Sequence, residues 1–399
     1  MIWRSATALA GFALRLAAPF SGADLRERLA LTGPDIVPGG IWLHAASVGE
    51  LNSARVLIEA LAGDLPLTVT TNSRTGRALA RKLGYTAVLA PLDVPQVLER
   101  FLQRIEPSVL VTVENELWPN RSAQADARGV AQVVVGARIS ARSAARWGKV
   151  PGLIRPMLAR LAALSAQDTG SEERLLRLGL RPEAVCSRLN LKLVGPSRVE
   201  PVPDSPARAL TVLAASTHEG EDEIVLDAYL AARQSAPALR LILAPRHPER
   251  GDAVADLLAA RGVEFVRRSR GGGLDAGVLL ADTLGEMAQW YAAAGICVTC
   301  GSYNDRGGHT PWEPAAWRCA ILHGPHVENH AADYADLGAA GAAAESLAAD
   351  LPHDLTALVA DPARQKSMGN MARDQLLARA GDPTALVQRI LDLARGRLV

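Results

Sequence analysis

The chain of 399 residues is long enough for two domains of ordinary size, and 49% of it is apolar, which suffices for two buried cores. The formal net charge is only +1 at pH 7, which argues against a general nucleic-acid binder, since such proteins carry a strong basic excess. The four cysteines (186, 297, 300 and 319) include a single C-x-x-C pair, so we expect buried free thiols in a reducing compartment and no zinc site.

Residues 1–20 are the first distinct segment. Their uncharged run, residues 5–14, is too short to span a bilayer. Arg4 and Arg15 are about three helical turns apart and therefore share one face of a helix whose remaining surface is mostly apolar. This pattern predicts a helix at a membrane surface, with its arginines reaching toward water. A signal peptide and a plain buried helix are the alternatives, although Arg15 interrupts the apolar core that a signal peptide needs.

Apolar runs then alternate with helix-like segments. The expected strands of the first half are residues 39–46, 67–71, 87–90, 108–113 and 131–135, and helices are expected at 51–62 and 94–105. The proline-rich stretch 196–206 predicts a linker. Strands are expected again at 209–215, 239–244, 277–281, 296–299 and 320–322, and residues 340–399 are expected to be helical. This alternation predicts two doubly wound α/β domains with polar sites facing each other across a cleft.

A glycine-rich stretch follows the expected strand 296–299. Gly301, Gly307 and Gly308 allow backbone N–H groups to approach an anion closely, and a helix expected to start near residue 311 adds its dipole. Arg306 and His309 add donors, and Glu313 is placed to accept hydrogen bonds from ribose hydroxyls. The segment therefore predicts a nucleotide or phosphate site. The alternative is an ordinary strand-to-helix turn of an α/β domain.

Carboxylates follow two expected strands of the first half. Glu50 ends the turn Ser47-Val-Gly-Glu50, at the carboxyl edge where open α/β sheets bind ligands. The alternative is that Glu50 only stabilises the start of the next helix. Glu114 and Glu116 lie in Glu114-Asn-Glu-Leu-Trp-Pro-Asn120, and two carboxylates at one strand end are unusual for a solvated loop.

Nine motifs together resemble the 3-deoxy-D-manno-octulosonic acid (Kdo) transferases of lipid A assembly, glycosyltransferase family 30. They occur in the family's order and cover nearly the whole chain. The matching pieces are His44-Ala-Ala-Ser-Val-Gly-Glu50, Pro91-Leu-Asp-Val-Pro95, Glu114-Asn-Glu-Leu-Trp-Pro-Asn120, Ala137-Arg-Ile-Ser-Ala-Arg-Ser143, Ser216-Thr-His-Glu-Gly-Glu221, Pro245-Arg-His-Pro-Glu-Arg250, Asp282-Thr-Leu-Gly-Glu286, Arg306-Gly-Gly-His309 and Gly324-Pro-His326.

The resemblance implies a GT-B-type fold of two Rossmann-like domains, with a membrane-associated helix (1–20), an acceptor domain (21–198) and a CMP-sugar domain (205–399). It implies CMP-Kdo as the donor and a lipid A precursor such as lipid IVA as the acceptor, in lipopolysaccharide core biosynthesis. The place of action would be the cytoplasmic face of the bacterial inner membrane, where the protein is peripheral or anchored by residues 1–20. No metal or cofactor is expected.

The resemblance also assigns roles. Glu50 matches the family's general base, and Glu114 and Lys192 match residues that support the transition state. The positions that match CMP-contacting residues are Pro245, Arg246, Leu284, Gly285, Glu286, Thr310, Pro311, Trp312 and Glu313. A carboxylate base suits a sugar hydroxyl, which is a poor nucleophile, and Arg246 with helix N-termini suits the phosphate of the leaving CMP. We therefore expect direct displacement with inversion.

Four segments depart from the family pattern. They are Cys300-Gly-Ser302 for Gly-Gly-Ser, Thr310-Pro-Trp-Glu313 for Asn-Pro-Leu-Glu, Asn72-Ser-Arg-Thr-Gly76 for Thr-Pro-Thr-Gly, and Arg188-Leu-Asn-Leu-Lys192, which lacks the usual glycine before Lys192. These departures leave open a GT-B transferase or epimerase that uses another nucleotide sugar. A non-catalytic paralogue that binds lipid or nucleotide is a further alternative, but it would need neither Glu50 nor Glu114.

Overall fold

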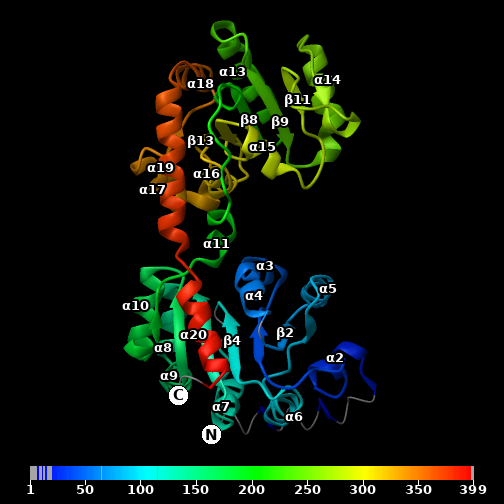
Figure 1. The fold of residues 1–399 in the computed structure, drawn as a ribbon, viewed down its shortest axis with the longest axis vertical. Helices are drawn as coiled ribbons and strands as arrows, with labels where there is room; N and C mark the ends of the chain where they lie inside the picture. Colours follow the sequence, from blue (N-terminus) through cyan, green and yellow to red (C-terminus); the bar gives the residue numbers. More distant parts are fainter. Residues whose placement is uncertain are drawn as a thin grey trace. The chain divides into compact units, whose positions relative to one another are not determined.

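The computed structural model describes residues 7–8, 11, 14–15, 20–63, 65–114 and 116–396. The chain divides into two compact units (Figure 1). The first unit comprises Met1–Gly195 and Arg379–Val399, and the second comprises Pro196–Ala378. Each unit has one seven-stranded sheet whose neighbouring strands run parallel, with helices between the strands. Both predicted Rossmann-like domains are thereby confirmed.

The sheet of the first unit has the strand order β3-β2-β1-β4-β5-β6-β7. Its strands are β1 (Ile41–His44), β2 (Leu67–Thr71), β3 (Thr86–Leu89), β4 (Val109–Val113), β5 (Ala131–Ala137), β6 (Leu161–Ala166) and β7 (Val185–Cys186). Its helices are α2 (Ala23–Arg28), α3 (Val48–Ser53), α4 (Arg55–Leu61), α5 (Arg74–Lys82), α6 (Pro95–Ile105), α7 (Pro119–Ala127), α8 (Ala141–Gly148), α9 (Pro151–Ala159), α10 (Thr169–Leu178), α11 (Leu191–Ser197) and α20 (Thr384–Ala394). A short 3-10 turn, Pro182–Ala184, precedes β7.

Strand β1 is apolar on both faces because helices cover both sides of a parallel sheet. Ile41 and Leu43 belong to the core beneath α3 and α4, while Trp42 belongs to the core on the other face. The Trp42 ring meets Phe101 of α6 edge-on, with 5.0 Å between ring centroids. This burial holds the carboxyl end of β1, where the candidate site begins, in a rigid position.

The last helix packs in the first unit rather than in the second. Helix α20 lies against α4 and β4 (Figure 1). Its residues Leu386, Ile390 and Leu391 are buried in the core that also contains Val111 of β4 and Leu57 of α4. The apolar stripe of α20 needs a partner, and it finds one on the first sheet. The expected second domain, 205–399, is therefore wrong at its end, because residues 379–399 belong to the first unit.

The sheet of the second unit has the order β10-β11-β9-β8-β12-β13-β14. Its strands are β8 (Thr211–Thr217), β9 (Arg240–Pro245), β10 (Val266–Arg267), β11 (Val278–Leu280), β12 (Ile296–Thr299), β13 (Ala320–His323) and β14 (Ala343–Glu345). Its helices are α12 (Pro206–Ala209), α13 (Glu221–Ser235), α14 (Gly251–Ala260), α15 (Met287–Ala293), α16 (Trp312–Ala316), α17 (Ala331–Ala339), α18 (Leu351–Ala360) and α19 (Pro362–Ala380). Short 3-10 turns occupy Pro248–Arg250, Arg268–Arg270 and Glu328–His330. The residues expected to be helical from 340 onward thus include one strand, β14.

The predicted linker is attached to the second unit. Arg373 of α19 donates hydrogen bonds to the carbonyl oxygens of Val199 (2.7 Å) and Ser197 (3.3 Å). Arg318 donates to the carbonyl of Val202 at 2.7 Å. Asp204 forms ion pairs with Arg318 and with Lys366 of α19. The proline-rich stretch is therefore held to the second unit by bonds to α19 and to Arg318, and it is not a flexible linker.

Most of residues 1–20 lie outside the described residues, so the membrane-associated helix stays a prediction. Of the described positions, Leu14 packs against the small cluster of Leu29, Val94 and Val97. Gly11 is buried. No helix in the described parts of the chain is both long enough and apolar enough to cross a membrane.

Candidate active site

The order of strands marks one place in each sheet. In the first sheet, β2 and β4 flank β1, so the direction of winding reverses between β1 and β4. In the second sheet, the same reversal falls between β8 and β12. Ligands of open α/β sheets bind outside the carboxyl ends of the strands at such a switch point. Glu50 follows β1 and Glu114 follows β4, so both predicted carboxylates lie at the first switch point.

Glu50 lies in the first turn of α3. The Ser47 side chain caps this helix and accepts a hydrogen bond from the Glu50 amide at 3.2 Å. The Glu50 carboxylate in turn accepts the Ala46 amide at 2.7 Å, so it does help to start the helix. Burial raises the pKa of Glu50, and the negative charges of Glu114 and Glu116 raise it further. A carboxylate whose proton affinity is raised is a better general base.

Glu114 adopts a backbone conformation that is rare for a residue with a side chain. Its φ is +56°, and its amide donates to the carbonyl of Val135 on β5 at 2.9 Å. Such left-handed residues cost on the order of 1–3 kcal/mol and collect at functional sites. The conformation turns the chain at the end of β4 and keeps Glu114 close enough to Glu50 for their charges to interact.

A chain of buried polar groups runs beneath these carboxylates. The Trp42 indole donates to the Thr70 hydroxyl at 2.9 Å, and that hydroxyl lies 2.9 Å from Nδ1 of His44. The Thr70 hydroxyl also donates to the Leu43 carbonyl at 3.5 Å. The second ring nitrogen of His44 is Nε2. That nitrogen faces the Glu116 carboxylate at 3.7 Å, and Glu116 also accepts the Trp118 indole at 2.6 Å. These polar contacts therefore lead from Trp42 in the core to the Glu116 carboxylate.

The titration of this network follows from its burial. Burial lowers the pKa of His44 to about 4, and the nearby charge of Arg121 lowers it as well. The contact with His44 lowers the pKa of Glu116 to about 2, with help from the Trp118 hydrogen bond. Burial also lowers the pKa of Arg121, to about 10. At neutral pH, His44 is therefore neutral, and Glu116 stays ionised beside Glu50.

Lys192 is not brought into this cluster. It is an exposed residue of α11, and it makes no ion pair with a described carboxylate. Its neighbour Leu191 packs over Gly136 near the carboxyl end of β5. Lys192 thus lies at the same edge of the sheet as Glu50 and Glu114, but its predicted role remains a prediction.

Glu221 organises the switch point of the second sheet. Its side chain is only 1% exposed, and it accepts three backbone N–H groups: those of Gly301 (2.7 Å), His218 (2.9 Å) and Tyr303 (2.9 Å). These bonds tie the loop after β8 to the loop after β12. Glu221 lies within the motif Ser216-Thr-His-Glu-Gly-Glu221, but no role was predicted for it from the sequence. In the sequence, Glu221 is only an acid in the first turn of an expected helix. That pattern gives no information about a hydrogen-bond partner 80 residues away.

Arg246 follows β9 directly. Its amide is bonded to the Thr217 carbonyl at 3.0 Å, while its side chain is exposed and makes no hydrogen bond to a described residue. Burial lowers the pKa of His309, and the charge of Arg246 adds to that shift, whereas at Glu313 the same charge opposes a pKa that is raised overall. Burial raises the pKa of Glu313, whose carboxylate accepts the Tyr291 hydroxyl at 3.3 Å. Arg246, His309 and Glu313 therefore lie close enough for their charges to interact, while their predicted contacts with phosphate and ribose stay predictions.

The other positions that were predicted to contact the CMP-sugar donor differ in their exposure to solvent. Pro245 is buried at the end of β9, and Leu284 is 79% exposed on the loop before α15. Gly285 has φ +85° in that loop. The Glu286 carboxylate is already engaged by Arg268 (2.5 Å) and by the Thr283 hydroxyl.

The altered segment at the start of α16 is mostly buried. Thr310 is half-buried and Pro311 is buried. Trp312 is only 4% exposed, so its side chain is buried in the fold and not presented at the surface. The replacement of the family's Leu by Trp312 therefore changes the packing of the core more than the surface that a ligand would contact.

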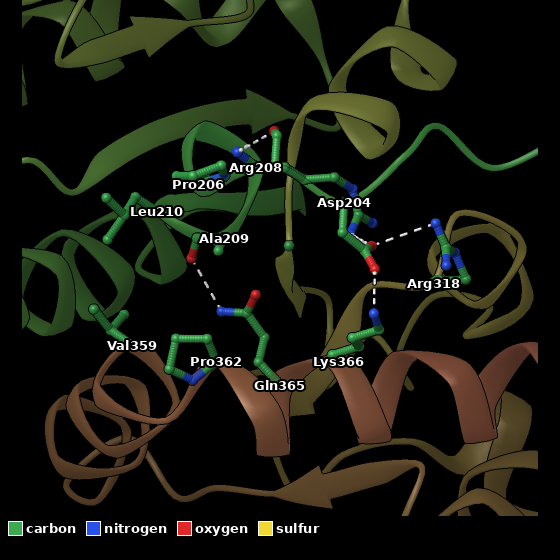
Figure 2. A pocket seen from close by; sticks show the side chains of 12 residues that line it. Asp204, Pro206, Arg208, Ala209, Leu210, Arg318, Val359, Pro362, Gln365 and Lys366 are labelled. Carbon is green, nitrogen blue, oxygen red and sulfur yellow. Dashed lines mark hydrogen bonds and ion pairs between the residues drawn. The ribbon is translucent and has the colours of Figure 1, made fainter.

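A cavity of about 490 Å³ lies elsewhere in the second unit (Figure 2). Leu210, Gly295 and Arg318 come just before β8, β12 and β13, so this cavity is at the amino edge of the sheet, opposite the switch point. At one side Asp204 bonds to Arg318 and Lys366, and at the other Gln365 donates to the Ala209 carbonyl at 3.0 Å. It contains none of the predicted site residues.

The cysteines are present as thiols. All four cysteines are free, and three of them (297, 300 and 319) are buried. Among the described residues, no group of three or more His, Cys, Asp or Glu side chains could hold a metal ion.

Two Rossmann-like units, each with one parallel seven-stranded sheet, form a fold of the GT-B type. UDP-GlcNAc 2-epimerase from Neisseria meningitidis bound to UDP-GlcNAc has a similar fold, with a TM-score of 0.57 over 90% of this chain and 100% of that chain. At 12% identity, this likeness extends to the fold alone.

Sequence relatives identify the family. A family model described as "3-Deoxy-D-manno-octulosonic-acid transferase (kdotransferase)" matches residues 23–194. The 3-deoxy-D-manno-octulosonic acid transferase of Haemophilus influenzae is 34% identical, covering 90% of this chain and 87% of that protein. The transferase of the same name from Bordetella pertussis is 35% identical, covering 95% and 92%. The chain belongs to the Kdo transferase family and is a glycosyltransferase.

Proposed function

We propose that this enzyme transfers Kdo from CMP-Kdo to a hydroxyl of a lipid A precursor, lipid IVA, in lipopolysaccharide core biosynthesis. Membership of the Kdo transferase family supports the sugar, and the bacterial relatives named above carry that activity in their names. The observation that carries the proposal is the half-buried Glu50, whose pKa is raised by partial burial and by the charges of Glu114 and Glu116 at the first switch point. A transferase to a hydroxyl needs such a base.

In the proposed reaction, Glu50 takes the proton of the acceptor hydroxyl as its oxygen attacks the anomeric carbon of Kdo. The bond from that carbon to the phosphate oxygen breaks, and CMP leaves from the opposite face, so the configuration inverts. In this proposal, Arg246 stabilises the charge of the leaving phosphate, together with amides of the 301–313 loop other than those of Gly301 and Tyr303, which Glu221 accepts. A cationic side chain and N–H donors at this position support a reaction that needs no metal ion.

The test is mass spectrometry of products formed from CMP-Kdo and a tetra-acylated lipid A precursor, with and without EDTA. We expect the acceptor mass to rise by whole Kdo residues in both samples. An unchanged acceptor would reject the proposed substrates, and loss of product in EDTA alone would reject metal independence. Calorimetry with CMP and UDP provides the second arm, because tighter binding of UDP would favour another nucleotide sugar.

We also propose that the enzyme works at the cytoplasmic face of the inner membrane and that residues 1–20 help to hold it there. The apolar surface with Arg4 and Arg15 on one side supports this placement. The measurement is flotation of full-length and truncated protein (residues 21–399) with vesicles that contain anionic lipid. Equal flotation of both proteins would rule out an anchoring role for the segment, provided that circular dichroism shows the truncated protein folded.

A further inference from the structure

Two histidines bridge the switch point of the second sheet. His218 follows β8, and His309 is in the glycine-rich loop after β12. Their Nε2 atoms lie 3.2 Å apart, and their rings are nearly parallel, at 9°. At this distance the two nitrogens share a hydrogen bond, so one of them carries the proton and the other accepts it.

The surrounding backbone is built to hold the two rings together. Glu221 accepts the amide of His218 and the amide of Gly301, which anchors both loops to one carboxylate. Gly301 has φ +72°, and a Cβ there would lie 3.0 Å from the His309 ring and 3.7 Å from the His218 ring. The Tyr334 hydroxyl donates to the His309 carbonyl at 2.9 Å. The ring contact is therefore a fixed feature of the site.

The charges around the pair are mostly positive. Arg246, His247 and Arg250 come from the segment after β9, Arg306 from the same loop as His309, and His330 from the turn before α17. The acid facing His218 is Glu221. Burial lowers the pKa of His309 to about 4, and the charges of His218 and Arg246 lower it as well. Burial also lowers the pKa of His218. Without an anion, the pair is therefore neutral at physiological pH.

A bound anion reverses this balance. A negative charge next to a histidine favours its protonated form, and the neighbouring arginine charges are offset at the same time. In the neutral pair the proton on Nε2 is already shared, so a second proton from solvent can enter only at an outer Nδ1. The pair then carries one positive charge and presents N–H donors on its outer edge.

We propose that the His218–His309 pair takes up one proton from solvent when the phosphate of the donor nucleotide binds, and that the charged pair then contacts this phosphate. The identity of the nucleotide rests on the function proposed above. The pair thus adds a proton-carrying anion contact to the site beside Arg246. Because binding consumes a proton, the affinity for the nucleotide falls as pH rises, at most about tenfold per pH unit.

The experiment is calorimetry of CMP binding to the full-length enzyme between pH 6.5 and 8.5. Each pH is measured in two buffers of different ionisation enthalpy, which counts the protons taken up. The phosphate of CMP itself titrates near pH 6, so the wild type is compared with His218→Asn and His309→Asn, one variant from each loop. His353→Asn, an exposed position on α18, is the matched control. Cytidine, which lacks the phosphate, is the second ligand.

We expect wild type and His353→Asn to take up a fraction of a proton that grows toward one as pH falls. Both pair variants should lose this uptake while they still bind cytidine, which shows that they are folded. Equal proton uptake in all four proteins would overturn the inference, as would equal uptake with cytidine and CMP. CMP binding without any proton uptake would reject the pair's role but leave the proposed donor intact. Failure of the wild type to bind CMP would reject both.

Discussion

The strongest structural prediction concerns Glu221. Its carboxylate is buried, and no cation is paired with it among the described residues. Its charge is instead stabilised by the three N–H groups of His218, Gly301 and Tyr303. Two of these bonds reach Oε2 and one reaches Oε1. In Glu221→Gln, the amide oxygen at the Oε2 position keeps two bonds, while the amide NH₂ group faces the Tyr303 amide, donor against donor.

The expected cost follows from this geometry. A hydrogen bond to a charged group is worth about 1.5–3 kcal/mol, so Glu221→Gln should destabilise the second unit by roughly that amount. Glu221→Ala leaves three buried or partly buried donors without a partner, at about 1–3 kcal/mol each, so we expect a loss of roughly 3–9 kcal/mol. That is a large share of the 5–15 kcal/mol that typically stabilises a domain.

Urea unfolding measures the loss of stability, and hydrogen exchange measures the loss of protection at the three amides. Exchange at the amides of residues 218, 301 and 303 should accelerate in Glu221→Gln, and the unfolding midpoint of the second unit should fall. Glu219→Gln is the control, because Glu219 is exposed in the same loop. If Glu221→Gln and Glu219→Gln unfold at the same urea concentration and exchange alike, Glu221 does not clamp the two loops and the reasoning fails.

Three further predictions concern Glu50, Arg246 and His44. Glu50→Gln should fold and bind CMP as the wild type does, but lose turnover by about 10²–10⁴-fold. In the wild type, kcat/KM should rise with pH through a pKa above that of an ordinary carboxyl group, because burial raises the pKa of Glu50, and Glu50→Gln should abolish this limb. Arg246→Ala should weaken CMP binding by roughly 1.5–3 kcal/mol in calorimetry, and an unchanged affinity would contradict its placement at the phosphate. His44 is buried with its pKa lowered to about 4, so between pH 6.5 and 4 the unfolded chain binds a proton that the folded chain does not. Stability should therefore fall as pH drops through this window, and His44→Gln should flatten the slope; an identical slope would show that His44 does not cause it.

Some features of this protein were readable from the sequence because they are encoded locally. The end of a buried strand, a capped helix start such as Ser47 before Glu50, and a glycine-rich turn such as Gly301–Gly308 each depend on a few adjacent residues. These local signals placed strands β2 and β12 within the correct bounds. They located Glu50, Glu114 and Arg246 just after strand ends and Glu313 in the first turn of a helix. They also separated the two α/β domains at the proline-rich stretch.

Other elements were decided only by tertiary packing. Strand β6, Leu161–Ala166, consists largely of alanine and leucine, which favour helix locally, and it is a strand because β5 and β7 pair with it on either side. Helix α20 has an apolar stripe that any sheet could bury, and its return to the first sheet required the fold. Glu221 and Gly301 are 80 residues apart, and His218 and His309 are 91 apart. Sequence spacing contains no information about such pairs, because they meet only when the strand order sets β8 beside β12.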